Sequence, residues 1–412
     1  MSETFELVPF AMAHGGAAIG RHAGRAVFVP YAIPGERLRV EIVEDKGRFA
    51  HARIVEIIEP SPDRVEPPCP HFGPGLCGGC SFQHIAYERQ LEIKRSIVQD
   101  QLERIGKFEG VPVHPTIPSP EPWQYRSYAT FTMTDDGKPA FYSDDNRRLV
   151  PIEVCYIIHP ALLELFEMMD FEPGNITRMK LQVGSDPEDR MLVIETVDDL
   201  PPEIEVDFPV SINMLLSDNE PVNLIGRSSV RYQVFNRTFR VTAGAFFHAN
   251  VPVVEALVEL VLGALNLQGD EVLLDLYSGV GVLTAFLAER ADLVVSVESY
   301  PPAVTDAEVN LDDLENVDLV EGPVEAVLED LEGPFDAIVL DPPPGGLSVE
   351  AIDELGRLAA PVLVYVSSDP ATLARDARRL VDNHGYQLVE VQPVDMHPQA
   401  HHVMCVAVLR HA

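Results

Sequence analysis

Thiols at metal-binding spacing are the residues best suited to chemistry in the first half of this chain. Cys77 and Cys80 form a Cys-Gly-Gly-Cys turn, and Cys69 precedes that turn. The two glycines let the backbone fold closely over a metal, and tetrahedral zinc and four-iron clusters both usually take four protein ligands. Cys155 is our candidate for the fourth ligand. The spacing therefore predicts a metal centre that joins two separate segments.

The type of metal stays open at this level. His71 and His84 are alternative ligands if the metal is zinc. The chain has five cysteines, and the odd number favours metal binding or reactive thiols over a disulfide framework. Three interpretations of these cysteines therefore remain open: a zinc site, an iron–sulfur cluster, or buried structural thiols.

A glycine turn in the second half predicts a nucleotide-type pocket. Residues 272–288 read VLLDLYSGVGVLTAFLA, an apolar strand followed by Gly279, Gly281 and an amphipathic stretch. Such a turn brings backbone N–H groups at a helix N-terminus close to a ligand. Glu298 ends the next strand, where an acid takes ribose hydroxyls, and Asp341 ends a later strand, FDAIVLD, before three prolines. An ordinary strand–turn–helix and a simple loop terminator are the plainer alternatives.

The elements that must position these residues fall into three groups. Short alternating runs over residues 5–58 predict a small OB-like β-barrel, a proline-rich linker follows at 59–70, and helical periodicity covers 87–105. Residues 111–235 read as strands of a mostly antiparallel region. From 272 on, strands and helices alternate as in a doubly wound α/β sheet. We expect three domains, at 1–60, 61–238 and 239–412, with predicted C-terminal strands at 272–276, 293–298, 317–320, 335–340, 361–366, 386–392 and 403–409.

Composition limits the class of protein. The net charge of −35 argues against a generally cationic nucleic-acid binder. The imbalance is uneven, because residues 1–60 hold seven Lys or Arg against eight Asp or Glu, whereas residues 270–412 hold six against 27. An RNA partner would therefore bind mainly the N-terminal half. No apolar run is long enough to cross a membrane and the N-terminus lacks signal-peptide features, so we expect a cytoplasmic protein, monomeric and without membrane contact.

Taken together, these motifs resemble those of the RNA uracil-C5 methyltransferases, a family with an N-terminal TRAM domain, a cluster-bearing central domain and a C-terminal Rossmann-like S-adenosylmethionine (SAM) domain. The specific matches are CGGCSFQH from Cys77, LLDLYSGVGVLT from Leu273, IVLDPP from Ile338, VYVSSDPATLARD from Val364 and VDMHPQAHHV from Val394. The resemblance implies a [4Fe–4S] cluster on Cys69, Cys77, Cys80 and Cys155. It implies an rRNA or tRNA substrate, and SAM bound by His248, Tyr277, Gly279, Gly281, Glu298 and Asp341.

Two positions depart from the chemistry that this family uses. A cysteine thiolate adds to carbon 6 of uracil so that carbon 5 can accept the methyl group, and a carboxylate then removes the carbon 5 proton. The family's Ser-Cys-Asn-Pro turn reads Ser-Ser-Asp-Pro here, which puts Ser368 at the nucleophile position. The family's base position is occupied by Met404. A serine hydroxyl is far less ionised than a thiol near pH 7, and methionine cannot accept the proton.

Three hypotheses follow. The first is an active SAM-dependent RNA methyltransferase, with altered chemistry that needs no covalent intermediate. The second is a non-catalytic RNA-binding or regulatory relative, a pseudoenzyme that keeps the cluster and the barrel. The third is an iron–sulfur redox sensor. Cys405 is a poor replacement nucleophile, because it follows Met404 on a predicted strand and should point to the opposite face.

Overall fold

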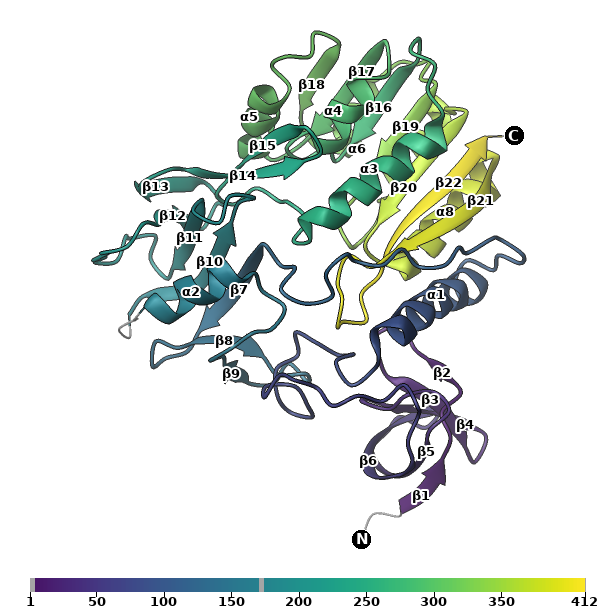
Figure 1. The fold of residues 1–412 in the computed structure, drawn as a ribbon. Helices are drawn as coiled ribbons and strands as arrows, with labels where there is room; N and C mark the ends of the chain where they lie inside the picture. The colour runs from purple at the N-terminus through teal and green to yellow at the C-terminus, as the bar shows by residue number, and fades with distance from the viewer. Residues whose placement is uncertain (1–3, 170–173, 412) are drawn as a thin grey trace.

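The computed structural model describes residues 4–169 and 174–411. Figure 1 shows three lobes, with the N-terminal barrel at the bottom, a β-rich central lobe at the left and the C-terminal sheet at the top. Over the described residues, no helix combines the length and the apolar run that crossing a bilayer requires.

The N-terminal lobe is a six-stranded sheet with the order β1-β5-β6-β4-β3-β2. Alternate residues of its strands are buried, which matches the alternating sequence pattern. The turn before β5 is fixed by the buried Glu36 carboxylate, which accepts from the Ile33 amide at 2.9 Å and pairs with Arg64 beyond the barrel. The strands are β1 (Thr4–Leu7), β2 (Ala11–Met12), β3 (Ala18–His22), β4 (Arg25–Val29), β5 (Arg37–Asp45) and β6 (Phe49–Glu59).

The central lobe contains a seven-stranded sheet with the order β13-β12-β11-β10-β7-β8-β9. All neighbours are antiparallel except β11 and β12, and helix α2 (Pro160–Met168) packs its apolar side on the sheet. A separate hairpin of β14 (Ser229–Val234) and β15 (Arg237–Thr242) packs in the core of the C-terminal lobe instead. The sheet strands are β7 (Tyr128–Met133), β8 (Pro139–Tyr142), β9 (Leu149–Pro151), β10 (Ile176–Val183), β11 (Arg190–Thr196), β12 (Ser211–Leu215) and β13 (Pro221–Ile225).

The C-terminal lobe is the predicted doubly wound sheet, with the order β18-β17-β16-β19-β20-β22-β21. The first five strands in this order are parallel, and β22 lies antiparallel between β20 and β21. Its inner strands are apolar on both faces because helices cover both. The strands are β16 (Val272–Leu276), β17 (Leu293–Glu298), β18 (Val317–Glu321), β19 (Ala337–Leu340), β20 (Val362–Ser367), β21 (Tyr386–Val394) and β22 (Met404–His411).

Helices α3, α4 and α5 cover one face of this sheet, and α6, α7 and α8 cover the other. Asp369 caps α8 by accepting hydrogen bonds from the amides of Ala371 and Thr372, and Gly385 ends that helix in the left-handed conformation. The helices are α3 (Val251–Leu265), α4 (Val282–Ala288), α5 (Pro301–Asn310), α6 (Val324–Asp330), α7 (Val349–Leu358) and α8 (Pro370–His384).

Helix α1 (Tyr87–Arg104) belongs to two cores at once. Its Ile93 and Ile97 pack with the barrel, whereas Val98 and Leu102 pack with the C-terminal sheet. In Figure 1 it lies between these two lobes, below β21 and β22. The helix therefore joins the barrel to the sheet by apolar packing on two sides.

Candidate active site

A cavity of about 80 Å³ lies at the carboxyl ends of β16 and β19, where doubly wound sheets bind ligands. It is lined by both polar and apolar side chains. Four of the residues implied by the resemblance line it, namely His248, Tyr277, Gly279 and Asp341.

The glycine turn has the backbone shape that its sequence predicts. Gly279 and Gly281 have φ angles of 57° and 85°, in the left-handed region. A Cβ added at Gly279 would meet no atom within 4 Å, so this glycine faces open space on the cavity side. A Cβ at Gly281 would lie 2.9 Å from Leu311 Cδ1, so this glycine lets the turn pack against α5 and the residue after it. Gly279 thus serves the cavity and Gly281 serves the packing behind it.

Glu298 lies at the end of β17 beside the turn rather than in the cavity wall. Its carboxylate accepts from the Gly279 amide at 2.9 Å, and from the amides of Ser299 at 2.7 Å and Tyr300 at 2.8 Å. These bonds tie the glycine turn to the next strand. A contact of Glu298 with a ribose stays a prediction.

Two carboxyl groups differ in their environment within the cavity. Asp341 Oδ2 lies 3.1 Å from His248 Nε2, and both side chains are partly exposed. Asp275 is buried on β16, where burial raises the pKa of its carboxyl to about 7, although Thr284 donates to it at 2.6 Å. His248 and Asp341 therefore contact each other at the cavity wall, whereas Asp275 is enclosed in the sheet.

Ser368 and Met404 flank the last paired position of two neighbouring strands. Ser367 and Cys405 are paired across β20 and β22, Ser368 follows Ser367 in the turn after β20, and Met404 precedes Cys405 at the start of β22. Ser368 lies in the turn between β20 and α8, and this turn is tightened by mutual hydrogen bonds between Ser367 and Asp369. The structure thus brings the two substituted family positions together at one edge of the sheet.

The side chains at these positions are unsuited to covalent catalysis. Met404 is 2% exposed and packs in the apolar cluster that contains Val394 and Met396. Cys405 is fully buried in the cluster on the other face of the sheet, and this burial raises the pKa of its thiol. Its side chain therefore cannot replace a thiolate at the cavity.

Histidines from distant segments surround the Ser368 turn. His14, from the barrel, places its Nε2 3.1 Å from Asp369 Oδ2. His401 and His402 have ring centroids 4.2 Å apart, and burial lowers the pKa of both, to about 3 for His401. Burial likewise holds the pKa of His397 well below its usual range. The three histidines of the 397–402 segment are therefore neutral near pH 7.

Four cysteines line a second cavity, of about 200 Å³, between the central lobe and the segment before α1. They are Cys69, Cys77, Cys80 and Cys155. Burial raises the pKa of each thiol, to about 11 for Cys77 and about 12 for Cys80, and the thiols raise one another's pKa by their proximity. The Gly79 amide donates to Cys77 Sγ at 3.4 Å.

The side chains of this cavity can be compared with the ligand geometry that a metal ion requires. Among the residues that the structure describes, no three His, Cys, Asp or Glu side chains approach closely enough to hold one metal ion. Thiolates on one tetrahedral zinc lie about 3.8 Å apart, because each Zn–S bond is about 2.3 Å. The four thiols share the cavity wall with apolar side chains such as Phe141 and Ile152 and with polar ones such as Gln83 and Arg126.

Of the two predicted histidine alternatives, His71 lies at the wall of this cavity and His84 does not. The His84 ring stacks on Phe72 at 5.7 Å, and burial lowers its pKa to about 3. His71 is therefore the one of the two histidines that lines the cysteine cavity, whereas His84 packs against Phe72.

Some residues at the site were not among those predicted. Asp275 interrupts an apolar strand, and a carboxylate within a buried run was a usable signal. The His14–Asp369 contact and the ion pair between Lys94 and Asp395 left no such signal, because their partners are more than 300 positions apart in the sequence.

Comparison with known proteins agrees with this architecture. Residues 227–412 match the family model for tRNA (uracil-5-)-methyltransferases, and residues 11–55 match the TRAM domain. An uncharacterized RNA methyltransferase of Halalkalibacterium halodurans is 34% identical, over 97% of this chain and 95% of its own length. An uncharacterized RNA methyltransferase of Streptomyces avermitilis is 35% identical, over 100% and 99%.

A solved structure covers the whole arrangement. The crystal structure of Pyrococcus abyssi tRNA (uracil-54, C5)-methyltransferase in complex with S-adenosyl-L-homocysteine superposes with a TM-score of 0.73 at 25% identity, over 98% of this chain and all of that one. The glycine-turn cavity, the TRAM barrel and these full-length relatives lead to one conclusion. This chain belongs to the TRAM-containing RNA methyltransferases of the uracil-5-methyltransferase family.

Proposed function

We propose that this protein is a SAM-dependent methyltransferase that acts, as a cytoplasmic monomer, on rRNA or tRNA. The observation that carries the proposal is the cavity at the carboxyl ends of β16 and β19, where the open glycine turn at Gly279 faces the His248–Asp341 pair. The SAH-bound relative supports SAM as the cofactor. SAM carries a methyl group on its sulfonium sulfur. When this methyl group is transferred to an RNA atom, the remainder of the cofactor leaves as S-adenosylhomocysteine.

The chain's own residues suggest how the acceptor is handled. Gly279 gives a ligand access to the backbone, and Glu298 fixes the turn from behind. His248, held by Asp341, is placed to take the proton that the accepting atom loses on methylation. This arrangement suits an acceptor atom that is nucleophilic without prior activation.

Methylation at carbon 5 of uracil lacks support from the side chains present. That route needs a thiolate that adds to carbon 6 and a base that removes the carbon 5 proton. Ser368 and Met404 occupy these positions, and Cys405 lies on the opposite face of the sheet. We therefore propose a different acceptor atom.

A non-catalytic RNA-binding protein is the second candidate. The observation that favours it is that Met404, which cannot accept a proton, fills the family's base position and packs in an apolar cluster. This candidate keeps the barrel and the cysteine cavity, and requires no SAM.

The first prediction tests both candidates. Wild type should bind SAM in a calorimetric titration and transfer a labelled methyl group to tRNA or rRNA without forming 5-methyluridine. Ser368→Cys/Met404→Glu should form 5-methyluridine, because it restores the thiol and the base to neighbouring positions. Nucleosides released from the RNA are identified by mass spectrometry.

Arg410→Gln, at an exposed position of the same strand β22, is the matched control and should behave as wild type. Formation of 5-methyluridine by wild type would refute the altered acceptor. Failure of wild type to bind SAM would leave the non-catalytic candidate.

We also propose that the four cysteines hold a [4Fe–4S] cluster. Four thiols line one cavity, and four cysteine thiolates are the ligand set that a four-iron cluster takes. The cluster would hold residues 69–80 against Cys155 and so contribute to the structure of the central lobe.

The second prediction concerns metal content. Protein purified without oxygen should carry four iron atoms and four acid-labile sulfides per chain, as the cluster requires. Cys77→Ser or Cys155→Ser should lose both. Cys405→Ser, a buried cysteine far from this cavity, should retain them. Stoichiometric zinc without iron in the wild type would refute the cluster.

A further inference from the structure

Helix α1 presents two buried polar side chains, Gln90 and Lys94, to the C-terminal lobe. They lie four residues apart, so they project from the same face of the helix. Both contact the segment 395–402, which connects β21 to β22 and contains neither helix nor strand. In Figure 1 this segment is the yellow loop that extends from the sheet toward the N-terminal parts of the chain.

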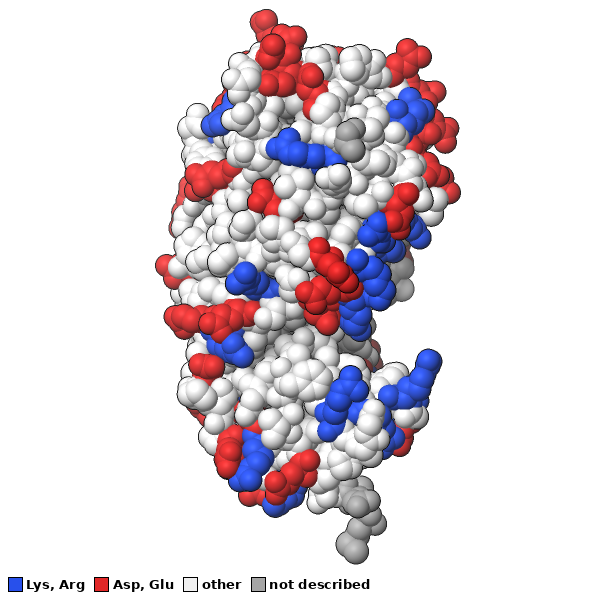
Figure 2. All heavy atoms as spheres, turned by 90° about the vertical axis from the view of Figure 1, so that its right-hand side faces the viewer, with Lys and Arg blue, Asp and Glu red and all other residues white. Residues whose placement is uncertain are grey.

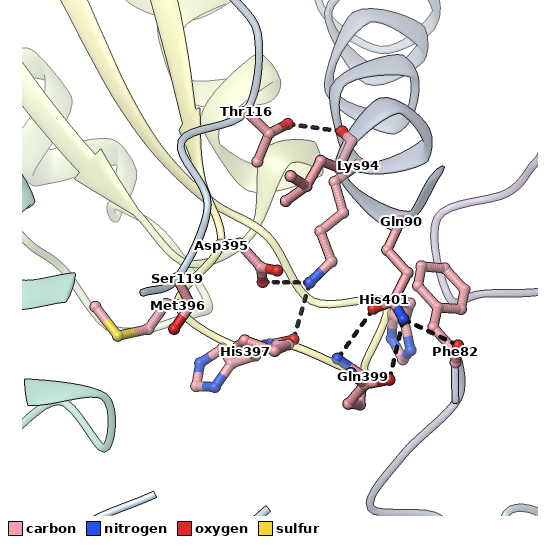
Figure 3. A network of polar contacts seen from close by, with 12 residues as sticks. Phe82, Gln90, Lys94, Thr116, Ser119, Asp395, Met396, His397, Gln399 and His401 are labelled. Carbon is pink, nitrogen blue, oxygen red and sulfur yellow. Dashed lines mark hydrogen bonds and ion pairs between the residues drawn. The ribbon is translucent and has the colours of Figure 1, made fainter. Parts of the chain in front are cut away.

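Lys94 fixes the first half of this segment (Figure 3). Its Nζ donates to Asp395 Oδ1 at 2.5 Å and to the backbone carbonyl of His397 at 2.8 Å. Both charged side chains have no exposed surface. Burial lowers the pKa of Lys94, and Asp395 opposes that shift.

Gln90 fixes the second half through both ends of its amide. Its Nε2 donates to Gln399 Oε1 at 3.0 Å, and its Oε1 accepts from the Gln399 backbone amide at 3.1 Å. The Phe82 amide donates to the Gln399 carbonyl at 2.9 Å. Residues from the N-terminal half of the chain therefore hold segment 395–402 both near its start, at Asp395, and in its second half, at Gln399.

Other upstream segments complete the attachment. Tyr125 donates to the carbonyl of Pro398 at 3.1 Å, Asn250 donates to the carbonyl of Met396 at 3.4 Å, and the Ser81 hydroxyl accepts from the His401 amide at 2.8 Å. A segment without regular structure thus has its conformation set by side chains that come from outside β21 and β22.

The buried ion pair contributes little net free energy to folding. Removing a lysine and an aspartate from water costs about as much as their attraction returns, so apolar residues of similar size serve stability equally well. What a buried pair with fixed hydrogen bonds adds is a single geometry. The segment that receives this geometry carries His397 and His402 and leads directly into Met404 beside Ser368.

We propose that Lys94 and Gln90 are positioning residues, by which helix α1 sets the conformation of segment 395–402 and thereby the placement of His397 and His402 next to the candidate active site. Lys94 donates a hydrogen bond to the backbone carbonyl of His397, and the His397 ring points away from Lys94 (Figure 3). The inference rests on the proposed function, because it takes the cavity to be the site of RNA methylation. Lys94 and Gln90 lie outside residues 227–412, the part matched by the methyltransferase family model.

The test uses the full chain with two variants. Lys94→Met/Asp395→Leu replaces the pair by apolar side chains and avoids an unpaired buried charge, so it should fold. Gln90→Met leaves the ion pair in place and removes the second attachment, together with the hydrogen bonds that the Gln90 amide donates to the carbonyls of Phe82 and Ile85. In each variant, hydrogen exchange of backbone amides in 396–403 should rise about tenfold, because the segment loses one or more of its hydrogen bonds.

The same variants should also weaken binding of a labelled uridine-rich single-stranded RNA about tenfold, with the SAM dissociation constant unchanged. This split is expected because the glycine turn, between β16 and α4, takes part in none of the hydrogen bonds that hold the segment. Arg104→Met, an exposed substitution in the last turn of the same helix, is the control and should change neither measurement.

Wild-type exchange rates in 396–403 for Gln90→Met and for the folded double variant would refute the proposal, since the pair would then serve packing alone. Loss of SAM and RNA binding together, with unchanged exchange in 396–403, would refute it as well. If wild type binds no RNA, the proposed function fails, while the exchange measurement still decides whether α1 sets this segment.

Discussion

Among single residues, Asp275 has an environment that should produce a measurable pH effect on folding. Its carboxyl is enclosed in β16, and burial, with smaller contributions from the charges of Asp341 and Glu298, raises its pKa from 3.8 to about 7. The folded state therefore holds a proton on this group at pH values where the unfolded chain has lost it. The resulting stabilisation is complete below pH 3.8 and is lost as the pH rises through about 7.

The third prediction follows from this residue. Asp275→Asn keeps an acceptor for the Thr284 hydroxyl and removes the titrating group. The free energy of unfolding of wild type should therefore fall, relative to that of the variant, between pH 4 and pH 7. Urea denaturation at a series of pH values measures the difference.

Asp318→Asn, at an exposed position on β18 of the same sheet, is the matched control and should show no such trend. A pH-independent difference between wild type and Asp275→Asn would contradict the assignment of the buried carboxyl.

For single residues, the sequence showed which residue types are present at the candidate site but not which of them are in contact in the folded protein. The substitutions at positions 368 and 404 were visible in the sequence, but only the pairing of β20 with β22 shows that they lie at the same end of two neighbouring strands. The contact of His14 with Asp369 joins the barrel to the α8 cap, and no local pattern encodes a contact between residues so far apart.

Among the elements, the glycine turn divides its two tasks between two residues. Gly279 faces the cavity, whereas Gly281 begins α4 and lies against Leu311. Both have left-handed φ angles, so alanine at either position costs about 1–2 kcal/mol of backbone strain.

The fourth prediction separates these tasks. Gly281→Ala should lower the melting temperature more than Gly279→Ala, because the added methyl group also collides with Leu311. Gly279→Ala should reduce SAM affinity more than Gly281→Ala, because Gly279 lines the cavity and Gly281 does not. Thermal unfolding and calorimetric SAM titration give the two rankings, and the same ranking in both would contradict the division.

Elements with a strong local pattern were predictable and their packing was not. The seven C-terminal strands and the 87–105 helix agree with the sequence pattern to within a few residues, because apolar runs and periodicity are local properties. The insertion of β22 between β20 and β21 is a property of the assembled sheet. The sharing of α1 between two cores likewise depends on contacts that its own sequence does not specify.

At the scale of the whole molecule, charge is distributed unevenly. Figure 2 shows acidic side chains gathered at the top, over the C-terminal lobe, and basic side chains more often toward the middle and the bottom. Many basic side chains are next to acidic ones, such as Arg25 beside Asp45 and Arg39 beside Glu56. RNA binding must therefore use local groups of basic residues, since the protein as a whole repels phosphate.

The fifth prediction places one such group on the barrel. Arg21 on β3 and Arg48 before β6 are exposed, and across β3, β4 and β6 they lie near the half-exposed ring of Phe49. Arg21→Gln/Arg48→Gln should weaken RNA binding and lower the slope of log affinity against log salt by about 0.7 for each RNA phosphate that the variant no longer neutralises. Filter binding at several salt concentrations measures the slope.

Arg290→Gln/Arg410→Gln makes the same charge change at exposed positions of the acidic C-terminal lobe. It should leave the slope unchanged. An equal effect of both double variants would mean that net charge, and not the barrel surface, governs binding.

The 301-residue separation of Lys94 from Asp395 also bears on how the chain is made and folded. During synthesis α1 emerges long before its partner segment, so its Lys94 face must stay hydrated until β21 and β22 have been translated. The strand that completes the sheet and the segment that neutralises this lysine then arrive together. The last folding step should accordingly be slow and dependent on the late-translated strands, leaving the nascent chain reliant on chaperones while the apolar flank of α1 is uncovered.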